Sequence, residues 1–380
     1  MQLRGSKQAV AAGGAAIAVL AMAACSSSSS STTTAPAAST PASSAAASSP
    51  AAGTSSSAAA VSGTINAAGS TFQTNFQQAA ISGFKAVQPG ITVNYDPVGS
   101  GTGRSDLYSN TVLFAGSDSS IPASETSKVP AGKKVLYFPV QVGPIAIAYN
   151  LSGVTGLKLD PATLAGIFQG KITTWSDPAI KALNPGVSLP SSSITLAVRS
   201  DSSGTTSNFS QYLEDAAGSA WTLGQGSTIK WPSTARAGNG GSGLAQIVKS
   251  TPGAIGYVDF STATASGLSA ASIKNSAGDF VAPSTAGATA AASHVTPKAN
   301  LTFSAVDQPG ADSYPITYQS WDLVYSVQPN ATDVALLKAY LGYLLSSPGQ
   351  QLLSTINLAA LPSSIDQAAV AQLSQITASS

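Results

Sequence analysis

Three segments of the chain repeat one arrangement, in which a short strand runs into a loop of glycine, serine and threonine and then into a helix. The predicted strands are residues 62–66, 91–95 and 194–198, and the loops are residues 67–71, 97–103 and 199–206. The predicted helices begin at residue 72 and cover about 104–110 and 208–214. On the first helix, Phe72, Phe76, Ala79, Ala80 and Phe84 share one face. This alternation predicts an α/β fold with its loops at the carboxyl ends of the strands, where such sheets bind ligands.

Each of these loops has the features of an anion site. Backbone amides, hydroxyl donors and the positive end of a helix dipole meet where the strand gives way to the helix. One such loop is a common helix cap, and Ser70 or Thr71 is well placed to cap the first helix. Three in one chain, one of them carrying Arg199, are more than capping alone would produce.

A fourth loop, residues 114–118, ends in Asp118. An ionised carboxylate only accepts hydrogen bonds, so beside an anion it is compatible with a ligand that carries a proton. Phosphate as HPO₄²⁻ or H₂PO₄⁻ has such a proton, and fully ionised sulfate has none. Because unpaired acceptors that face each other in a dry site are costly, Asp118 is expected to select phosphate over sulfate.

The ordered set of loop sequences resembles the phosphate-binding protein of bacterial ABC phosphate importers, the PstS type. The matching segments are residues 68–72, 99–103, 116–118 and 199–205, followed by 238–240, 252–257 and 314–316. No single short motif is specific, but the ordered set is, and it covers about residues 62–362. One departure is Gln73, which stands where the family often has proline.

The resemblance implies the ligands residue by residue. On the first side of the site it implies Thr71, Phe72 through its backbone amide, Ser100 and Asp118. On the second side it implies Arg199, Ser203, Gly204 through its amide, and Thr205. Asp201 is expected to hold the Arg199 side chain, and Ser70 to support the first loop.

The fold that the resemblance implies is the two-lobed periplasmic-binding-protein fold of type II, in which each lobe has a central mixed sheet flanked by helices and crossover strands form the hinge. Residues 62–142 and 312–372 are expected to form lobe I, and residues 143–311 lobe II. The apolar run 135–150, broken at Gly143-Pro144, suits the first crossing. A last strand at 318–327 and a helix at 331–345, ending at Pro348-Gly349, are expected in lobe I.

The N-terminal region indicates export. Arg4 and Lys7 precede an apolar stretch, residues 9–24, that is too short to span a bilayer. Two alanines then precede Cys25, as in a bacterial lipobox, so residues 1–24 are expected to be a lipoprotein signal peptide and Cys25 the lipidated residue; the alternative is an ordinary signal peptide with a bystander cysteine. Residues 26–60 contain only Ser, Thr, Ala, Pro and Gly, which predicts a disordered tether over 25–61.

Composition argues against several function classes. Only 33 residues, 9%, are charged, and a net charge of +1 does not favour nucleic-acid binding. One Cys excludes an intramolecular disulfide or a multi-Cys metal site, and the single His294 lies in a polar stretch unsuited to catalysis. Gly238, Gly240 and Gly243 match a dinucleotide fingerprint by letter but are expected to form a helix start. No metal and no cofactor are expected.

These observations lead to one main hypothesis and two alternatives. The main hypothesis is a monomeric, lipid-anchored receptor on the outer face of the bacterial cell membrane, which binds inorganic phosphate between its lobes and hands it to the membrane permease of an ABC importer. It is not expected to be an enzyme. The alternatives are a secreted phosphatase or esterase with the same phosphate-cradling loops, and a receptor for another oxyanion.

Overall fold

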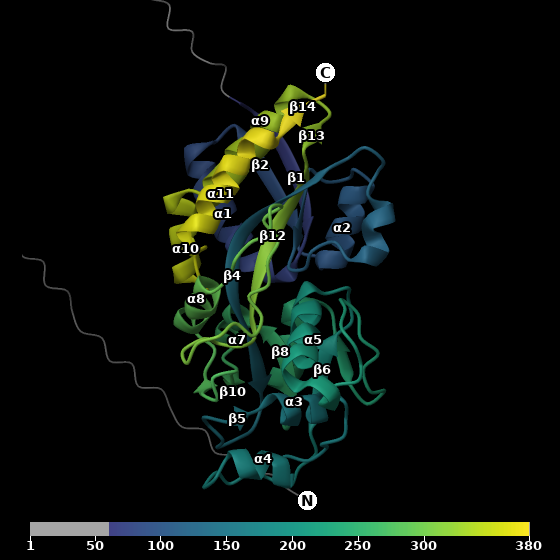
Figure 1. Cartoon of the computed structure of the whole chain (residues 1–380), viewed down its shortest axis with the longest axis vertical. Coiled ribbons are helices and arrows are strands. Elements are labelled where there is room, and N and C mark those ends of the chain that lie inside the picture. Colours follow the sequence, from purple (N-terminus) through teal and green to yellow (C-terminus); the bar gives the residue numbers. More distant parts are fainter. Residues whose placement is uncertain (1–60, 380) are drawn as a thin grey trace, which may run out of the picture. The chain divides into compact units, whose positions relative to one another are not determined.

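The computed structural model of the protein describes residues 61–379. The expected signal peptide 1–24, Cys25 and the expected tether up to residue 60 lie outside the described residues. The described part has the two-lobed α/β architecture that the sequence predicts, built on a sheet that runs through both lobes (Figure 1).

The sheet of the first lobe consists of three parallel strands followed by two longer antiparallel ones. Its order is β2 (Ile91–Asp96), β1 (Gly63–Gly69), β3 (Phe114–Ser117), β12 (Thr317–Tyr325) and β4 (Val135–Tyr149). Strand β1 pairs in parallel with both β2 and β3, and β12 runs antiparallel to β3 and β4. The carboxyl ends of the three parallel strands therefore lie at one edge of this sheet.

The sheet of the second lobe repeats this plan. Strand β4 continues into it and pairs antiparallel with β8 (Ala254–Asp259), which is followed by β6 (Thr195–Arg199) and β7 (Arg236–Gly238) in parallel. The short β9 (Ser269–Ala270) pairs with the end of β4. In the first lobe, β1 lies between β2 and β3, and β3 pairs with the long antiparallel strand β12. In the second lobe, β6 likewise lies between β7 and β8, and β8 pairs with the long antiparallel strand β4.

Strand β4 joins the two lobes without interruption. Its residues up to Pro144 pair with β12, and from Ile145 onward they pair with β8. The sequence predicted a break at Gly143-Pro144, and this detail was wrong. Proline lacks an amide hydrogen, but the strand continues because Ile145 donates to the carbonyl of Ile316 at 2.8 Å.

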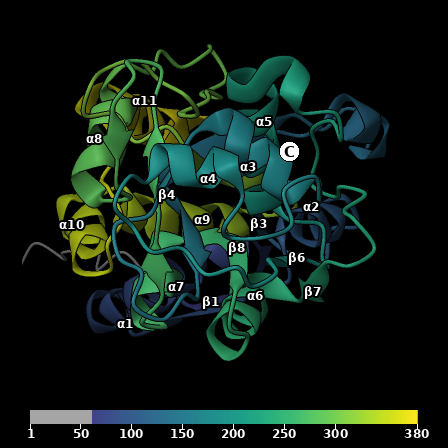
Figure 2. The same cartoon turned by 90° about the horizontal axis from the view of Figure 1, so that it is seen from below.

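Helices cover both faces of each half of the sheet. In the first lobe, α2 (Ser100–Tyr108) lies on one side, and α1 (Thr74–Val87), α9 (Ala331–Leu344), α10 (Ser347–Thr355) and α11 (Ser363–Gln372) lie on the other (Figure 1). In the second lobe, α3 (Pro161–Phe168) and α5 (Gly204–Ala217) lie opposite α6 (Gly240–Ser250) and α7 (Phe260–Ala265) (Figure 2). The smaller elements are α4 (Pro178–Leu183), α8 (Thr285–Ser293), β5 (Lys158–Leu159), β10 (Ser272–Lys274), β11 (Phe280–Val281), β13 (Val327–Gln328) and β14 (Thr377–Ala378).

Several predicted boundaries shift in the structure. The first helix starts as a 3₁₀ turn, Thr71–Gln73, before α1 begins. Helices α2 and α5 start four residues earlier than predicted, at Ser100 and Gly204, so the loops before them are shorter. Pro348 does not simply follow a helix end but lies in the first turn of α10, where proline is tolerated.

The face of α1 that packs on the sheet is less apolar than predicted. Phe76, Ala80 and Phe84 are fully buried as expected, whereas Ala79 is only half-buried. Gln73, just before the helix, and Gln77, one turn further on, are also completely buried. In residues 61–379, no helix combines the length and apolar character that crossing a membrane requires.

Candidate functional site

The site lies where the strand ends of the two lobes face each other. From the first lobe, the end of β1 supplies Ser70 and Thr71, the start of α2 supplies Ser100, and the end of β3 supplies Asp118. From the second lobe, β6 ends in Arg199 and α5 begins at Gly204. The strand register brings the ends of β1 and β3 side by side, because Gly69 pairs with Gly116.

Asp118 lies at the centre of the first-lobe half, with only 1% of its surface exposed. The Ser70 hydroxyl lies 2.6 Å from its Oδ1 and 2.7 Å from its Oδ2. The Ser320 hydroxyl donates to Oδ1 at 2.6 Å, and the Ser100 hydroxyl to Oδ2 at 3.4 Å. Three hydroxyl groups from three elements thus converge on one carboxylate.

Two of these hydroxyls have their direction fixed by a backbone amide. The Phe72 amide donates to Ser70 Oγ at 3.1 Å, and the Asp118 amide donates to Ser100 Oγ at 3.2 Å. A hydroxyl that accepts from an N–H has its own proton free to donate, so both point their protons at the Asp118 carboxylate. Burial raises the pKa of Asp118 to about 6, and the hydrogen bonds of Ser320, Ser70 and Ser100, with the charge of Arg199, act to lower it.

The second-lobe half is dominated by one cation. Arg199 is buried, and its Nε donates to Asp201 Oδ1 at 2.7 Å, while its Nη2 bonds Asp201 Oδ2. Asp201 is itself held by the amide of Gly240 at the start of α6, at 3.0 Å. The guanidinium plane is therefore fixed on one side, and among the described residues its Nη1 has no hydrogen-bond partner.

The start of α5 brings backbone donors to the same place. Ser203 caps the helix by accepting from the Thr206 amide at 3.1 Å. Gly204 lies directly against Ser100 and Asp118 of the first lobe, and a Cβ added to it would be 2.7 Å from the Cβ of Asp118. Glycine is required at this position because the two lobes meet there. Thr205 follows in the first turn and is 3% exposed.

Direct hydrogen bonds join the lobes around the site. The Gly101 amide donates to the Ser202 carbonyl at 3.0 Å, and the Asn208 side chain donates to the Asp118 carbonyl at 2.7 Å. Thr71 lies against Gly240 and Gly241 at the start of α6, so it also faces the second lobe. The lobes are thus in contact on both sides of the predicted ligand residues.

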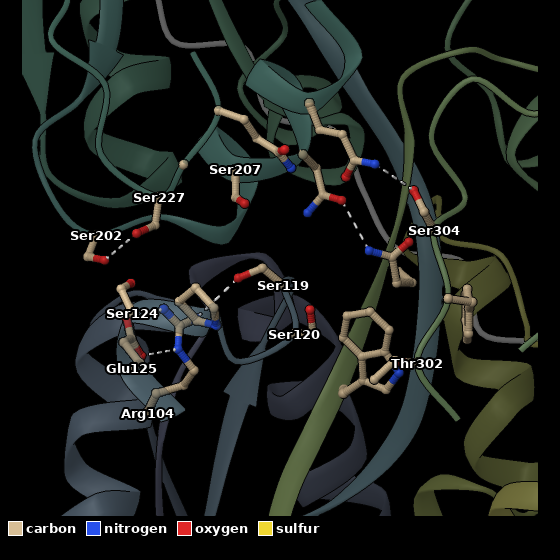
Figure 3. Close-up of a pocket in the computed structure, with 18 of the residues that line it drawn as sticks. Arg104, Ser119, Ser120, Ser124, Glu125, Ser202, Ser207, Ser227, Thr302 and Ser304 are labelled. Carbon is tan, nitrogen blue, oxygen red and sulfur yellow. Dashed lines mark hydrogen bonds and ion pairs between the residues drawn. The ribbon is translucent and has the colours of Figure 1, made fainter. Parts of the chain in front are cut away.

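A polar cavity of about 890 Å³ adjoins this closed centre (Figure 3). Hydroxyl groups from both lobes line it, among them Ser119, Ser120, Ser202 and Ser207. Asn208 and Gln319 form the wall between this cavity and Asp118, because both amides donate to the Asp118 carbonyl. The cavity is an interlobe cleft beside the site.

Arg104 is a site-supporting residue that the sequence analysis did not single out. It is completely buried on α2, where its Nε and Nη2 bind the Glu125 carboxylate at 2.8 and 2.9 Å. Its Nη1 donates to the hydroxyls of Ser117 and Ser119 at 3.1 Å. Arg104 therefore holds the two residues that flank Asp118.

Ser320, Asn208 and Gln319 were also missed. Ser320 and Gln319 lie on β12, in a strand that was predicted only for its apolar character, and Asn208 lies one turn into α5. Polar residues inside such a strand are the one sequence signal that could have indicated them. His294 is exposed, as expected, and Gly240 begins α6, as expected of a helix start.

The structure thus brings together most of the predicted residues. Ser70, Ser100 and Asp118 form one hydrogen-bonded group, and Gly204 packs on it. Arg199, which Asp201 holds in place, is close enough for its charge to lower the pKa of Asp118. The Phe72 amide, expected to bind the ligand, donates to Ser70 in this structure, while the Phe72 ring packs on Tyr318 with ring centres 3.7 Å apart.

Comparisons with known proteins place the chain among binding proteins. A family model described as the PBP superfamily domain matches residues 54–348. The phosphate-binding protein PstS 3 of Mycobacterium leprae is 38% identical over 289 residues, covering 73% of this chain and 78% of that protein.

Solved structures show the same fold. A phosphate-binding protein from Stenotrophomonas maltophilia aligns with a TM-score of 0.67 at 20% identity, covering 82% of this chain and 94% of its own. A putative phosphate ABC transporter substrate-binding protein from Clostridium perfringens, with bound phosphate, aligns with a TM-score of 0.58 at 17% identity, covering 79% of this chain and 100% of its own. The chain therefore belongs to the PBP superfamily and, within it, to the family of PstS-type phosphate-binding proteins.

Proposed function

We propose that this protein binds inorganic phosphate between its two lobes and delivers it to the permease of an ABC importer. The carrying observation is the arrangement at Asp118, a buried carboxylate that receives three hydroxyl protons and stands opposite Arg199 and the start of α5. Such a site offers donors from one side and a fixed acceptor from the other, which suits an anion that carries a proton. The similar proteins named above are phosphate-binding proteins, which supports the same ligand.

The proposed ligand set divides between the lobes. Thr71, the Phe72 amide, Ser100 and Asp118 would bind from the first lobe, with Ser70 in support. From the second lobe, Arg199 would bind through Nη1, which Asp201 leaves available, together with Ser203, Thr205 and the Gly204 amide. The lobes are in contact around these residues, so an anion bound among them would be buried and shielded from water.

Calorimetric titration of the purified protein with phosphate and with sulfate tests this proposal. We expect one phosphate per chain, and sulfate binding weaker by at least about 10³-fold, because a site built around a ligand proton leaves Asp118 unpaired when that proton is missing. Equal affinity for the two anions would overturn the role of Asp118, and no binding of phosphate would overturn the function.

We infer the cellular setting from the sequence alone. Lipidation at Cys25 would hold the protein on the outer face of the membrane, where an importer receives its ligand. Labelling with a radioactive fatty acid, in cells that express the protein or its Cys25→Ala variant, tests the anchor. Label in both variants would contradict it.

A receptor role without catalysis is part of the proposal. Turnover of a chromogenic phosphomonoester by the purified protein, at a rate that follows the protein through purification, would contradict it. A receptor is expected to give no turnover above a buffer control and to bind the inorganic product phosphate.

A further inference from the structure

A line of buried polar side chains leads away from Asp118 through the interior of the first lobe. Ser320 on β12, Gln73 before α1, Gln77 on α1 and Tyr340 on α9 are each completely buried. Burying a polar group is costly unless it is hydrogen-bonded, and these four satisfy one another in sequence. Apolar residues could fill the same space, so the presence of four buried polar side chains there calls for an explanation.

Every hydrogen bond along this line points toward Asp118. The Tyr340 hydroxyl donates to Gln77 Oε1 at 2.6 Å, and Gln77 Nε2 donates to Gln73 Oε1 at 2.9 Å. Gln73 Nε2 donates to Ser320 Oγ at 2.7 Å, and Ser320 donates to Asp118 Oδ1 at 2.6 Å. We call these four residues the relay.

The direction of the relay is fixed by a backbone group. Gln73 Nε2 also donates to the carbonyl of Trp321 at 3.1 Å, and a carbonyl can only accept. The other end of that amide, Gln73 Oε1, must therefore accept, and Gln77 supplies the proton. Because Ser320 accepts from Gln73, its single proton is left to donate. The shorter of its two donor contacts is the one to Asp118 Oδ1, at 2.6 Å, since the Ser117 carbonyl lies 3.4 Å away.

We propose that Tyr340, Gln77, Gln73 and Ser320 are positioning residues for phosphate recognition, which keep Asp118 an acceptor and thereby set the discrimination between protonated and unprotonated oxyanions. This inference rests on the proposed phosphate function. Together with Ser70 and Ser100, the relay directs hydroxyl protons at the carboxylate, which favours the ionised form of Asp118 over the protonated one. Hydrogen bonds aligned in one direction polarise one another, which strengthens the last bond to Asp118.

Other titratable groups surround Asp118 and must stay unchanged in a test. Arg199 of β6 acts on it from the second lobe, and Tyr95 of β2 and Tyr318 of β12 both lie within the reach of its charge. Tyr318 also responds to Asp259 of β8. Asp322, two residues beyond Ser320, takes a second hydrogen bond from Gln77 at 3.4 Å.

The test compares Ser320→Ala and Tyr340→Phe with the unchanged protein. Phosphate and sulfate affinities are measured by calorimetry from pH 5 to pH 8.5. Burial already raises the pKa of Asp118 to about 6, and loss of a donor raises it further. The decline of phosphate affinity toward acid pH should therefore begin about one pH unit higher in Ser320→Ala. In Tyr340→Phe, which acts only through polarisation, the shift should be a few tenths of a pH unit. Sulfate should gain relative affinity over the same pH range, because a protonated Asp118 can donate to it.

Tyr343→Phe is the matched control. Tyr343 lies on the same helix and packs its ring against Phe84, as Tyr340 does, but takes no part in the relay. It should leave both the pH profile and the selectivity unchanged. If Ser320→Ala does not fold, Tyr340→Phe, which removes a single oxygen far from the ligand, decides the matter.

The outcomes separate the relay from the function. If the unchanged protein binds no phosphate, the proposed function fails. If it binds phosphate, but both variants keep its pH profile and its selectivity, or Tyr343→Phe shifts them equally, the relay has no role in recognition and the inference is overturned.

Discussion

The two halves of the site solve the problem of holding an anion in opposite ways. The second lobe supplies positive charge and donors, with Arg199 braced by Asp201 and the start of α5 beside it. The first lobe presents a buried carboxylate with three hydroxyls aimed at it, backed by further buried polar groups. The contrast suggests that the second lobe provides most of the affinity for any oxyanion, while the first lobe decides which oxyanion is accepted.

The largest effect is expected from Arg199→Ala. It removes the cation of the second-lobe half and leaves Asp201 as an unpaired charge beside the ligand. Losing one partner of a buried charge pair costs about 2–5 kcal/mol, so phosphate affinity should fall by about 30-fold to several thousand-fold. Calorimetry measures this, with Arg236→Ala, an exposed arginine of the same lobe, as the control. If sulfate affinity does not fall along with phosphate affinity, the second lobe does not provide affinity for oxyanions in general.

The buried carboxyl group of Asp322, on β12 in the interior of the first lobe, should make the stability of the folded protein depend on pH. Burial raises the pKa of Asp322 from 3.8 to about 7, and its Oδ1 has no hydrogen-bond partner among the described residues. Because the folded-state pKa is raised, Asp322 contributes most stability below about pH 4, and that contribution is lost as the pH rises through about 7. Asp322→Asn cannot ionise, so at pH 8.5 it should be more stable than the unchanged protein by about 2–4 kcal/mol.

Urea denaturation of the ligand-free protein at pH 5 and pH 8.5 measures this difference. Some loss of stability at high pH should persist in the variant, since burial also raises the pKa of Asp118 and of Asp259 to about 6. Asp279→Asn, at an exposed position, should leave the difference in stability between the two pH values unchanged. A variant that is no more stable than the unchanged protein at pH 8.5 would show that Asp322 ionises without cost.

Asp118→Asn separates the two halves most directly. The amide of Asn keeps one uncharged acceptor oxygen and replaces the other carboxylate oxygen by an N–H donor, so a phosphate proton meets a weaker acceptor while sulfate gains a donor. Phosphate affinity should fall by about 10- to 100-fold and sulfate affinity should rise, in contrast to the joint loss expected for Arg199→Ala. Calorimetry at pH 8 distinguishes the two patterns, with Asp96→Asn as an exposed control. Equal losses for both anions would remove the distinction between the lobes.

The sequence predicted the parts of the fold that depend on local patterns. Strand–loop–helix junctions follow from glycine and hydroxyl residues next to apolar runs, and the strands that precede Ser70, Ser100 and Arg199 lie close to their predicted positions. It did not predict the roles of Ser320 or Gln77, because each forms a hydrogen bond with a partner more than 200 residues away in the sequence. Gln73 was noted as a departure from the family pattern, but its role depends on β12, which local spacing does not reveal.

The smallest effect is expected at a contact between the lobes that lies away from the ligand. The Asn75 side chain on α1 donates to the Ser261 hydroxyl on α7 at 2.7 Å and joins the two halves without touching Asp118 or Arg199. Asn75→Ala should weaken only the closed arrangement, by about 0.5–1 kcal/mol, and lower the affinity for phosphate and for sulfate by the same factor of about 2 to 5. Ser261→Ala should have the same effect, and the double variant should be no weaker than either single one, because one shared hydrogen bond is lost in all three. A change in selectivity in either variant would mean that closure itself discriminates between anions, and the division of labour between the lobes would have to be given up.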